Sequence, residues 1–509
     1  MNRKYFIPVA FFSWLLLAGC EKLNEDPKAS LTPQSYFETQ SDLDAALAGV
    51  YSVLSYDGSY GFTSRMTSYF GAEDLTTDPG LNKADFRDFD RLSGSSSNGS
   101  MLAGYQGPWR CIYQANNLLA NYQKVKTTDD LKNQAAGQAY FLRAWSYYML
   151  VRTFGPVPVV TGPLSAEQRV PRADVASVYD TIVNDLTKAI GLLPTTFAGQ
   201  PGKVTTNSAK SLLADVYLTM SGWPLLQADK AALAASTANE VIQSAQYSLV
   251  PHYADVFTQN NTTESIFTLQ FNVSGGLPQR SYGSSSVPLD ETAVNGDGGW
   301  DDYYPEINFY LNAPKCERSV ATFYDTIKLL QPDKTTFNLV PWNSPLTHAG
   351  HPYYKKFRAG LGGDGVAETA TKILSIHPSP NKALDLIRYP MVLLDFAEAT
   401  ALSGGPNGDA YAAVNLVRAR AGELPLPPGL SATAFQDSVV RERAYEFAGE
   451  TGIRWFDICR LQILPQVIAS RSTLENPVNP ATVVQNAYLS PIPYQEMLLN
   501  PAWTQNSGY

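Results

Sequence analysis

Cysteine is scarce in this chain of 509 residues, which holds only four. The four cysteines, Cys20, Cys111, Cys316 and Cys459, lie far apart, and this spacing excludes a disulfide-dense scaffold and a cysteine-based zinc site. The sequence leaves a single bridge among the last three open, and we expect three free thiols. We predict no metal site and no cofactor.

The chain also lacks any apolar run long enough to span a membrane, which takes roughly 20 residues. Its longest apolar stretch, residues 5–18, follows Arg3 and Lys4 and has the length of a signal-peptide core. The stretch ends in the letters LAGC, where Cys20 directly follows small residues, as at the sites where bacterial lipoproteins are cut and acylated.

These features predict a lipoprotein signal peptide over residues 1–19 and lipidation of Cys20. The alternative is an ordinary secretory signal that ends near a cysteine. Residues 20–35 are polar and form a predicted tether to a single globular body over residues 36–509. Long acyl chains on one cysteine hold a protein on a membrane without a spanning segment.

An excess of positive charge is absent as well. The chain has 38 basic and 47 acidic residues, and removing residues 1–19 takes away Arg3 and Lys4, which leaves 36 against 47, a net charge of −11. Nucleic acid and anionic membrane surfaces both require a clustered positive face, so neither is an expected partner. Tyrosine is abundant (29 residues), and its half-apolar ring suits contact with sugars.

Helical periodicity dominates the rest of the chain and predicts a mainly α fold with a few short strands. Two helical hairpins, over residues 209–244 and 392–421, resemble tetratricopeptide units and should stack together because an isolated pair cannot bury its apolar face. Residues 266–271 favour a strand. Residues 57–107 and 272–380 are expected to be long loops that form a binding face. The other predicted helices are residues 43–54, 109–125, 135–154, 178–190 and 434–449.

Several chemical patterns have ordinary structural explanations. The glycines at 360, 362 and 365 match a nucleotide-binding pattern but lie outside a βαβ unit, so we interpret them as a turn. His348 and His351 are interpreted as loop residues. The acid pairs Glu73-Asp74 and Asp301-Asp302 could serve a glycosidase only at a separation that sequence does not give. Four arginines in helical segments, Arg143, Arg418, Arg443 and Arg454, are expected to pair with Glu398, Glu442, Glu446 or Asp457.

The aromatic residues of the predicted loops form the best functional signal. Sugar rings stack on aromatic faces while their hydroxyls bond to nearby amides and carboxylates, and residues 300–304 combine both kinds of side chain. Trp109 and Trp145 lie in helical segments and are expected in the core. The candidate ligand-binding residues are Trp300, Tyr303, Tyr304, Asp301, Asn295, Asp297, Tyr282, Trp342, Tyr69 and Asp74.

Five segments in order give the chain a resemblance to the SusD/RagB lipoproteins of Bacteroidetes outer membranes. The resemblance covers nearly the whole chain after the signal peptide. The segments are YFLRAWSYY with FGPVP (residues 140–148 and 154–158), RYPMVLLDFAEA (388–399), VRARAG (417–422), ERAYEFAGE with RWFD (442–450 and 454–457), and the ending from PIP (491–493) to NSGY (506–509). Cys459 and Pro390 depart from the family pattern in small ways.

The resemblance implies a SusD-like, tetratricopeptide-like helical frame with a loop-rich face. It also implies a non-enzymatic protein, lipid-anchored in the outer membrane and exposed at the cell surface. Such a protein captures an oligosaccharide and delivers it to a SusC-like TonB-dependent transporter. The alternatives are a lipid-anchored glycosidase and a scaffold that binds peptides in its tetratricopeptide-like groove.

Overall fold

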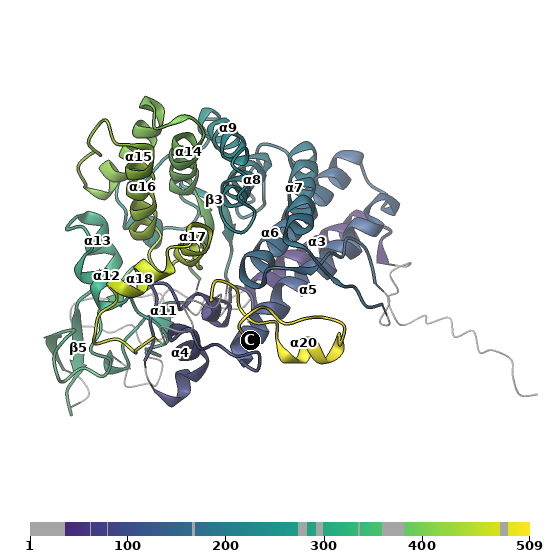
Figure 1. The fold of residues 1–509 in the computed structure, drawn as a ribbon. Coiled ribbons are helices and arrows are strands. Elements are labelled where there is room, and N and C mark those ends of the chain that lie inside the picture. Colours follow the sequence, from purple (N-terminus) through teal and green to yellow (C-terminus); the bar gives the residue numbers. More distant parts are fainter. Residues whose placement is uncertain are drawn as a thin grey trace, which may run out of the picture.

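The computed structural model describes residues 36–509 except 57, 62, 79, 165–167, 273–281, 292–298, 334–335, 359–380 and 479–486. An arc of long helices lies above a region of loops and short elements (Figure 1). Cys20, the signal peptide and the tether lie outside the described residues. The long helices are α3 (Gln40–Ser52), α5 (Gly99–Asn121), α6 (Asp129–Phe154), α7 (Val175–Leu192), α8 (Thr206–Ser221), α9 (Lys230–Gln243), α14 (Tyr389–Gly404), α15 (Gly408–Ala421), α16 (Ala432–Glu446) and α17 (Ile453–Leu461).

The two predicted helical hairpins, α8–α9 and α14–α15, pack together although they are distant in the sequence. Helix α14 lies against both α9 and α8, and α16 packs on α14 in turn (Figure 1). On the other side, α5, α6, α7 and α8 pack each against the next. This arrangement confirms the predicted fold class of tetratricopeptide-like helix pairs.

The ends of helix α6 have clear local causes. Thr128 caps its N-terminus by accepting a hydrogen bond from the Leu131 N–H, and two aspartates follow in the first turn. The C-terminus stops at Gly155, whose φ of +68° favours glycine, and Pro156 cannot continue the helix. The predicted stop is therefore confirmed, whereas the start lies about one and a half turns earlier than predicted.

Helix α5 begins at Gly99, ten residues before the predicted start at Trp109. Asn98 caps the helix through the Met101 N–H at 2.9 Å, a signal hidden in a Gly- and Ser-rich stretch. Gly107 and Pro108 argued against a helix here, yet both lie inside it. A Cβ at position 107 would lie 2.1 Å from the Gly58 carbonyl oxygen, so close packing overrides helix propensity.

The predicted strand at residues 266–271 is present as β3, which pairs antiparallel with β8. The prediction that the rest of residues 272–380 forms loops is wrong in part, because β5 and β6 form a hairpin there. The strands are β1 (Val157–Pro158), β2 (Arg172–Ala173), β3 (Ser265–Leu269), β4 (Phe323–Tyr324), β5 (Thr326–Leu330), β6 (Phe337–Pro341), β7 (Tyr353–Tyr354) and β8 (Leu384–Arg388). The short helices are α4 (Ala84–Asp90), α10 (Asp255–Thr258), α11 (Tyr282–Ser285), α12 (Ile307–Leu311), α13 (Glu317–Thr322), α18 (Leu464–Ser470) and α20 (Tyr494–Leu499).

Buried ion pairs tie the helical frame together. All four arginines singled out in the sequence form structural pairs, two of them with predicted partners and two with others. Since each carries a carboxylate partner inside the fold, these arginines are not an anion site. The pairs are Arg418–Glu442 at 2.8 Å and Arg443–Asp457 at 2.9 Å, as predicted, and Arg143–Asp185 at 2.7 Å and Arg454–Glu73 at 2.5 Å.

The three cysteines of the described body, Cys111, Cys316 and Cys459, are free thiols, as expected. Burial raises the pKa of the Cys111 thiol to about 12, which keeps it protonated and unreactive. None of the helices in the described part of the chain is long and apolar enough to cross a membrane.

Candidate functional site

Most of the candidate ligand-binding aromatics lie inside the protein. Tyr69, Tyr282, Tyr303 and Tyr304 are all 2% exposed or less. Tyr303, for example, packs against Tyr354 and Phe357, with ring centroids 6.0 and 6.1 Å away. In this arrangement the four rings support the loops and present no face to a ligand.

Two of the candidate rings keep partial exposure. Trp300 and Trp342 are half-buried, and both belong to the region between β3 and β8. Trp342 packs edge-on against Tyr310, with centroids 6.0 Å apart. Asn295 and Asp297 lie outside the described residues. The binding role of these four residues stays a prediction.

Asp74, another candidate, is also buried, at 1% exposure. One of its carboxylate oxygens accepts a hydrogen bond from the Gly449 N–H at 2.8 Å. Burial raises the pKa of Asp74 to about 7, which the Gly449 hydrogen bond only partly offsets. This carboxyl is therefore a structural group of the core rather than a contact for sugar hydroxyls.

Asp74→Asn should gain stability relative to the unchanged protein as pH rises. The folded pKa of about 7 lies above the ordinary value of 3.8, so folding takes up a proton between these two values and the unchanged protein loses stability as pH increases. Between pH 4 and pH 8, we expect the unfolding free energy of Asp74→Asn to rise relative to that of the unchanged protein by on the order of 1–4 kcal/mol. Guanidinium denaturation at each pH measures both values. Asp437→Asn, on the exposed side of α16, is the control and should show a flat difference. A flat difference for Asp74→Asn as well would contradict a protonated Asp74.

The acid pairs considered for glycoside hydrolysis are engaged in other contacts. Glu73 pairs with Arg454, and Asp302 pairs with Lys83, which is buried with it. Asp301 accepts hydrogen bonds from the Tyr353 hydroxyl at 2.7 Å and the Leu289 N–H at 3.1 Å. Each of these contacts holds a carboxylate in the fold and away from the role of a free acid or base.

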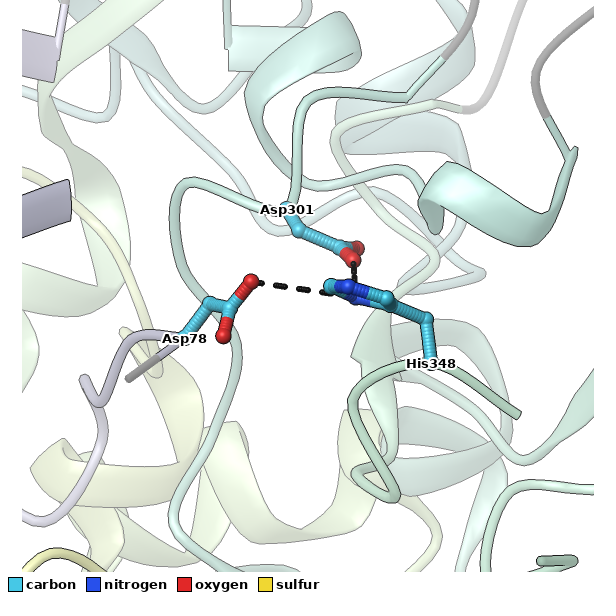
Figure 2. Close-up of side chains that lie close together, drawn as sticks. All are labelled: Asp78, Asp301 and His348. Carbon is cyan, nitrogen blue, oxygen red and sulfur yellow. Dashed lines mark hydrogen bonds and ion pairs between the residues drawn. The ribbon is translucent and has the colours of Figure 1, made fainter. Parts of the chain in front are cut away.

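Asp301 also belongs to a cluster of three side chains from separate loops, Asp78, Asp301 and His348 (Figure 2). His348 Nδ1 lies 3.0 Å from an Asp301 oxygen and 3.7 Å from an Asp78 oxygen. Both aspartates are buried, whereas the His348 side chain is 46% exposed. Burial raises the pKa of Asp301 to about 6, although Tyr353, Leu289 and His348 all favour its ionised form. The sequence indicates His348 only as a loop residue, and no sequence pattern singles out Asp78.

His351, three residues further on, takes a different place. It is buried, its ring stacks on Tyr304 with centroids 4.4 Å apart, and its Nε2 lies 3.0 Å from Glu475. The two histidines therefore do not act as a pair.

A hollow of about 650 Å³ lies between helix α5 and the C-terminal segment that contains α20. Trp109, Tyr113 and Trp503 line it, together with amide side chains that include Gln106 and Asn500. Tyr113 is 60% exposed. Trp109 is half-buried and packs edge-on against the buried Tyr147, so the expectation of a core residue holds for it only in part, while Trp145 is buried as expected. We call this hollow the α5–α20 pocket.

The walls of the α5–α20 pocket are fixed by specific bonds. The Trp503 indole N–H donates to the Val170 carbonyl at 3.0 Å, which sets the orientation of that ring. Asn506 anchors the C-terminal segment, since its amide donates to the carbonyls of Phe154 and Ser490 at 2.9 and 2.7 Å. Figure 1 shows α20 beside α5 near the C-terminus. The helical spacing of the α5 rings could have indicated this face, but nothing in the sequence connects it to Trp503.

The fold places the protein in the class of helical, tetratricopeptide-like proteins. Its aromatic pocket lies between α5 and α20, away from the stacked hairpins α8–α9 and α14–α15. Two family profiles match the chain, one described as "Starch-binding associating with outer membrane" over residues 23–218 and one described as "SusD family" over residues 348–509. The chain belongs to the SusD/RagB family.

Relatives and solved structures agree with this family. The chain is 27% identical to "SusD-like protein P2" of Formosa agariphila, over 97% of this chain and 98% of that protein. A SusD homologue from Bacteroides thetaiotaomicron superposes with a TM-score of 0.79 at 22% identity, covering 94% of this chain and 98% of that one. A "Laminarin binding SusD-like protein" superposes with a TM-score of 0.73 at 25% identity, covering 93% of this chain and all of that one.

Proposed function

We propose that the protein is a cell-surface lipoprotein that binds an oligosaccharide and delivers it to a SusC-like TonB-dependent outer-membrane transporter. The observation that carries the binding step is the α5–α20 pocket, in which exposed and half-buried rings stand beside amide side chains. Its volume of about 650 Å³ lies within the range of small-molecule sites in proteins.

Sugar binding follows from the chemistry of the pocket. Ring faces pack against the C–H faces of a sugar, and amides bond to its hydroxyls. Tyr113 offers the most accessible ring, while Trp503 is held in place by its bond to Val170. Preformed walls lower the conformational cost of binding, so affinity requires no large rearrangement.

The loop region is a second place for the same ligand. Trp300 and Trp342 are half-buried there, and Asn295 and Asp297 precede Trp300 in the sequence. We propose these four residues as further ligand contacts.

The laminarin-binding relative supports an oligosaccharide as the ligand and supplies a first probe. The family profile that mentions the outer membrane supports attachment there through lipid on Cys20. The SusC-like partner is proposed from the family as a whole.

The contacts made by the candidate catalytic acids agree with binding that leaves the ligand uncleaved. Glu73, Asp301 and Asp302 each contact a basic group or a donor, so a glycosidase has no free pair among them. A peptide scaffold is less well supported, because the relative whose name gives a ligand binds laminarin, a glycan.

Tyr113→Ala should weaken oligosaccharide binding by about tenfold or more, since stacking on an accessible aromatic ring contributes on the order of 1 kcal/mol or more beyond its buried area. The mature chain, which here means the protein without residues 1–20, is first applied to a glycan array that includes laminarin oligosaccharides. The best binder is then titrated by calorimetry. Leu424→Ala, at an 82% exposed position after α15, is the control and should bind as the unchanged protein does.

The same titration of Trp300→Ala shows whether the oligosaccharide binds in the α5–α20 pocket or at the loop region. A loss in Trp300→Ala with no change in Tyr113→Ala would move the site to the loops and overturn the pocket assignment. The absence of any glycan binding in the unchanged protein would overturn the proposed function itself.

A further inference from the structure

The Asp78, Asp301 and His348 side chains converge from three loops that are distant in the sequence (Figure 2). Their nearest ligand atoms, one imidazole nitrogen and two carboxylate oxygens, all lie within 4.8 Å of one another. Two carboxylates and a single histidine provide two negative charges at one point, which a divalent cation would neutralise.

In Asp78 and Asp301, hydrogen bonds to one carboxylate oxygen orient the other oxygen toward His348. Asp301 Oδ1 accepts from the Tyr353 hydroxyl and the Leu289 N–H, which leaves Oδ2 turned toward His348. Asp78 Oδ1 accepts from the Gly80 N–H at 2.9 Å, and its Oδ2 faces His348. Bonds of this kind orient the ligands of metal ions in proteins.

Tyr304 gives an independent sign of a missing partner. Its hydroxyl is fully buried and has no hydrogen-bond partner among the described residues. Tyr304 pairs with Thr76, two residues before Asp78, and its ring packs edge-on against Tyr353, whose hydroxyl donates to Asp301, so Tyr304 lies beside the cluster. A water bound to an ion at this cluster would supply the partner of the buried Tyr304 hydroxyl.

We infer that Asp78, Asp301 and His348 bind a divalent transition-metal ion of the Zn²⁺ class. Ligands at about 2.0–2.1 Å from Zn²⁺ lie roughly 2.9–3.4 Å from each other. The His348–Asp301 separation of 3.0 Å falls inside this range, and the His348–Asp78 separation of 3.7 Å lies a few tenths of an ångström above it. All three ligand atoms lie within 4.8 Å of one another, so binding would draw them slightly closer together.

The donor set disfavours Ca²⁺, which takes six to eight oxygen ligands, whereas imidazole suits Zn²⁺ and its neighbours. The ion would link the loops that carry the three residues. Because His348 is 46% exposed, a coordination position would remain open to water.

His348→Ala should weaken Zn²⁺ binding by at least about tenfold. The mature chain, freed of metal with a chelator, is titrated with Zn²⁺ by calorimetry, and we expect one ion per chain that an excess of Ca²⁺ does not displace. His252→Ala is the matched control, since His252 is exposed and contacts one carboxylate, Glu317, at 3.2 Å. It should bind Zn²⁺ as the unchanged protein does.

Asp78→Asn provides a second variant that keeps the shape of the side chain and should also weaken binding. The inference is overturned if Zn²⁺ does not bind at one ion per chain, if His348→Ala binds it as well as His252→Ala does, or if Ca²⁺ displaces it. Glycan binding is a separate measurement, so none of these results depends on the proposed function.

Discussion

Glu446→Gln should destabilise the protein by about 3–5 kcal/mol, because the change leaves buried guanidinium groups without their shared carboxylate. Glu446 is fully buried and contacts three arginines: Arg318 at 3.0 Å, and Arg388 and Arg420 more closely. Burial alone would raise the pKa of Glu446, yet the charges of Arg420, Arg388 and Arg318 hold it below its ordinary range. The carboxylate is thus ionised in the core, and a neutral glutamine cannot replace its charge.

The position of this cluster explains the size of the effect. Glu446 lies at the end of α16, Arg420 in α15, Arg388 at the end of β8 and Arg318 in α13. One carboxylate therefore joins the helical frame to the loop-rich region. Its loss should loosen that junction as well as lower the overall free energy of unfolding.

The measurement is guanidinium denaturation of the mature chain. Glu240→Gln is the matched control, since the Lys210–Glu240 pair has a similar separation of 2.7 Å but a Glu240 side chain that is 55% exposed. Exposed pairs contribute about 1 kcal/mol or less, so this variant should unfold almost as the unchanged protein does. Equal stability of the two variants would show that the buried cluster does not hold the fold together.

Gly107→Ala should destabilise the protein by about 2–4 kcal/mol, although alanine is the better helix former. A Cβ at this position would lie 2.1 Å from the Gly58 carbonyl oxygen and 2.7 Å from the Ser59 hydroxyl. The nearest contact is with backbone, so no side-chain rotation relieves it, and either α5 or the Gly58 turn must move. Gln106 and Trp109, on either side of this position, line the α5–α20 pocket, so ligand affinity should fall as well.

Gly49→Ala is the control for this substitution. Gly49 lies inside helix α3, and no atom would come within 4 Å of a new Cβ there. Removing a glycine from such a helix position should stabilise the protein by about 0.5–1 kcal/mol. Opposite signs for the two variants in thermal denaturation would support the packing argument, whereas a stabilising Gly107→Ala would contradict it.

Helices such as α7 were predictable from periodicity because they bury one face, whereas α6 and α14 are buried on most sides and show a weaker period. The hairpins α8–α9 and α14–α15 were visible as alternating small and large residues, and their mutual packing followed from the apolar faces that each pair left open. The start of α5 was missed because Gly107 and Pro108 dominate its local signal, while the reason for the glycine is a contact with Gly58.

The site was less predictable than the fold. Composition indicated an aromatic-rich region, but it could not separate a ring such as Tyr303, which packs on Tyr354 and Phe357, from one such as Trp300, which is half-buried. The Asp78–His348 contact joins two loops with no periodic signal. Side-chain direction in loops is set by tertiary contacts, and one sequence does not reveal them.

The central claim is that this protein binds an oligosaccharide through accessible aromatic rings and leaves it intact. The most direct test is calorimetric titration of the mature chain with laminarin oligosaccharides and the other best binders of a glycan array, followed by chromatography of the recovered ligand. We predict saturable binding at one site class, full recovery of uncleaved oligosaccharide and a loss of about tenfold or more in affinity for Tyr113→Ala. Cleaved products, or no saturable binding to any glycan, would contradict the account.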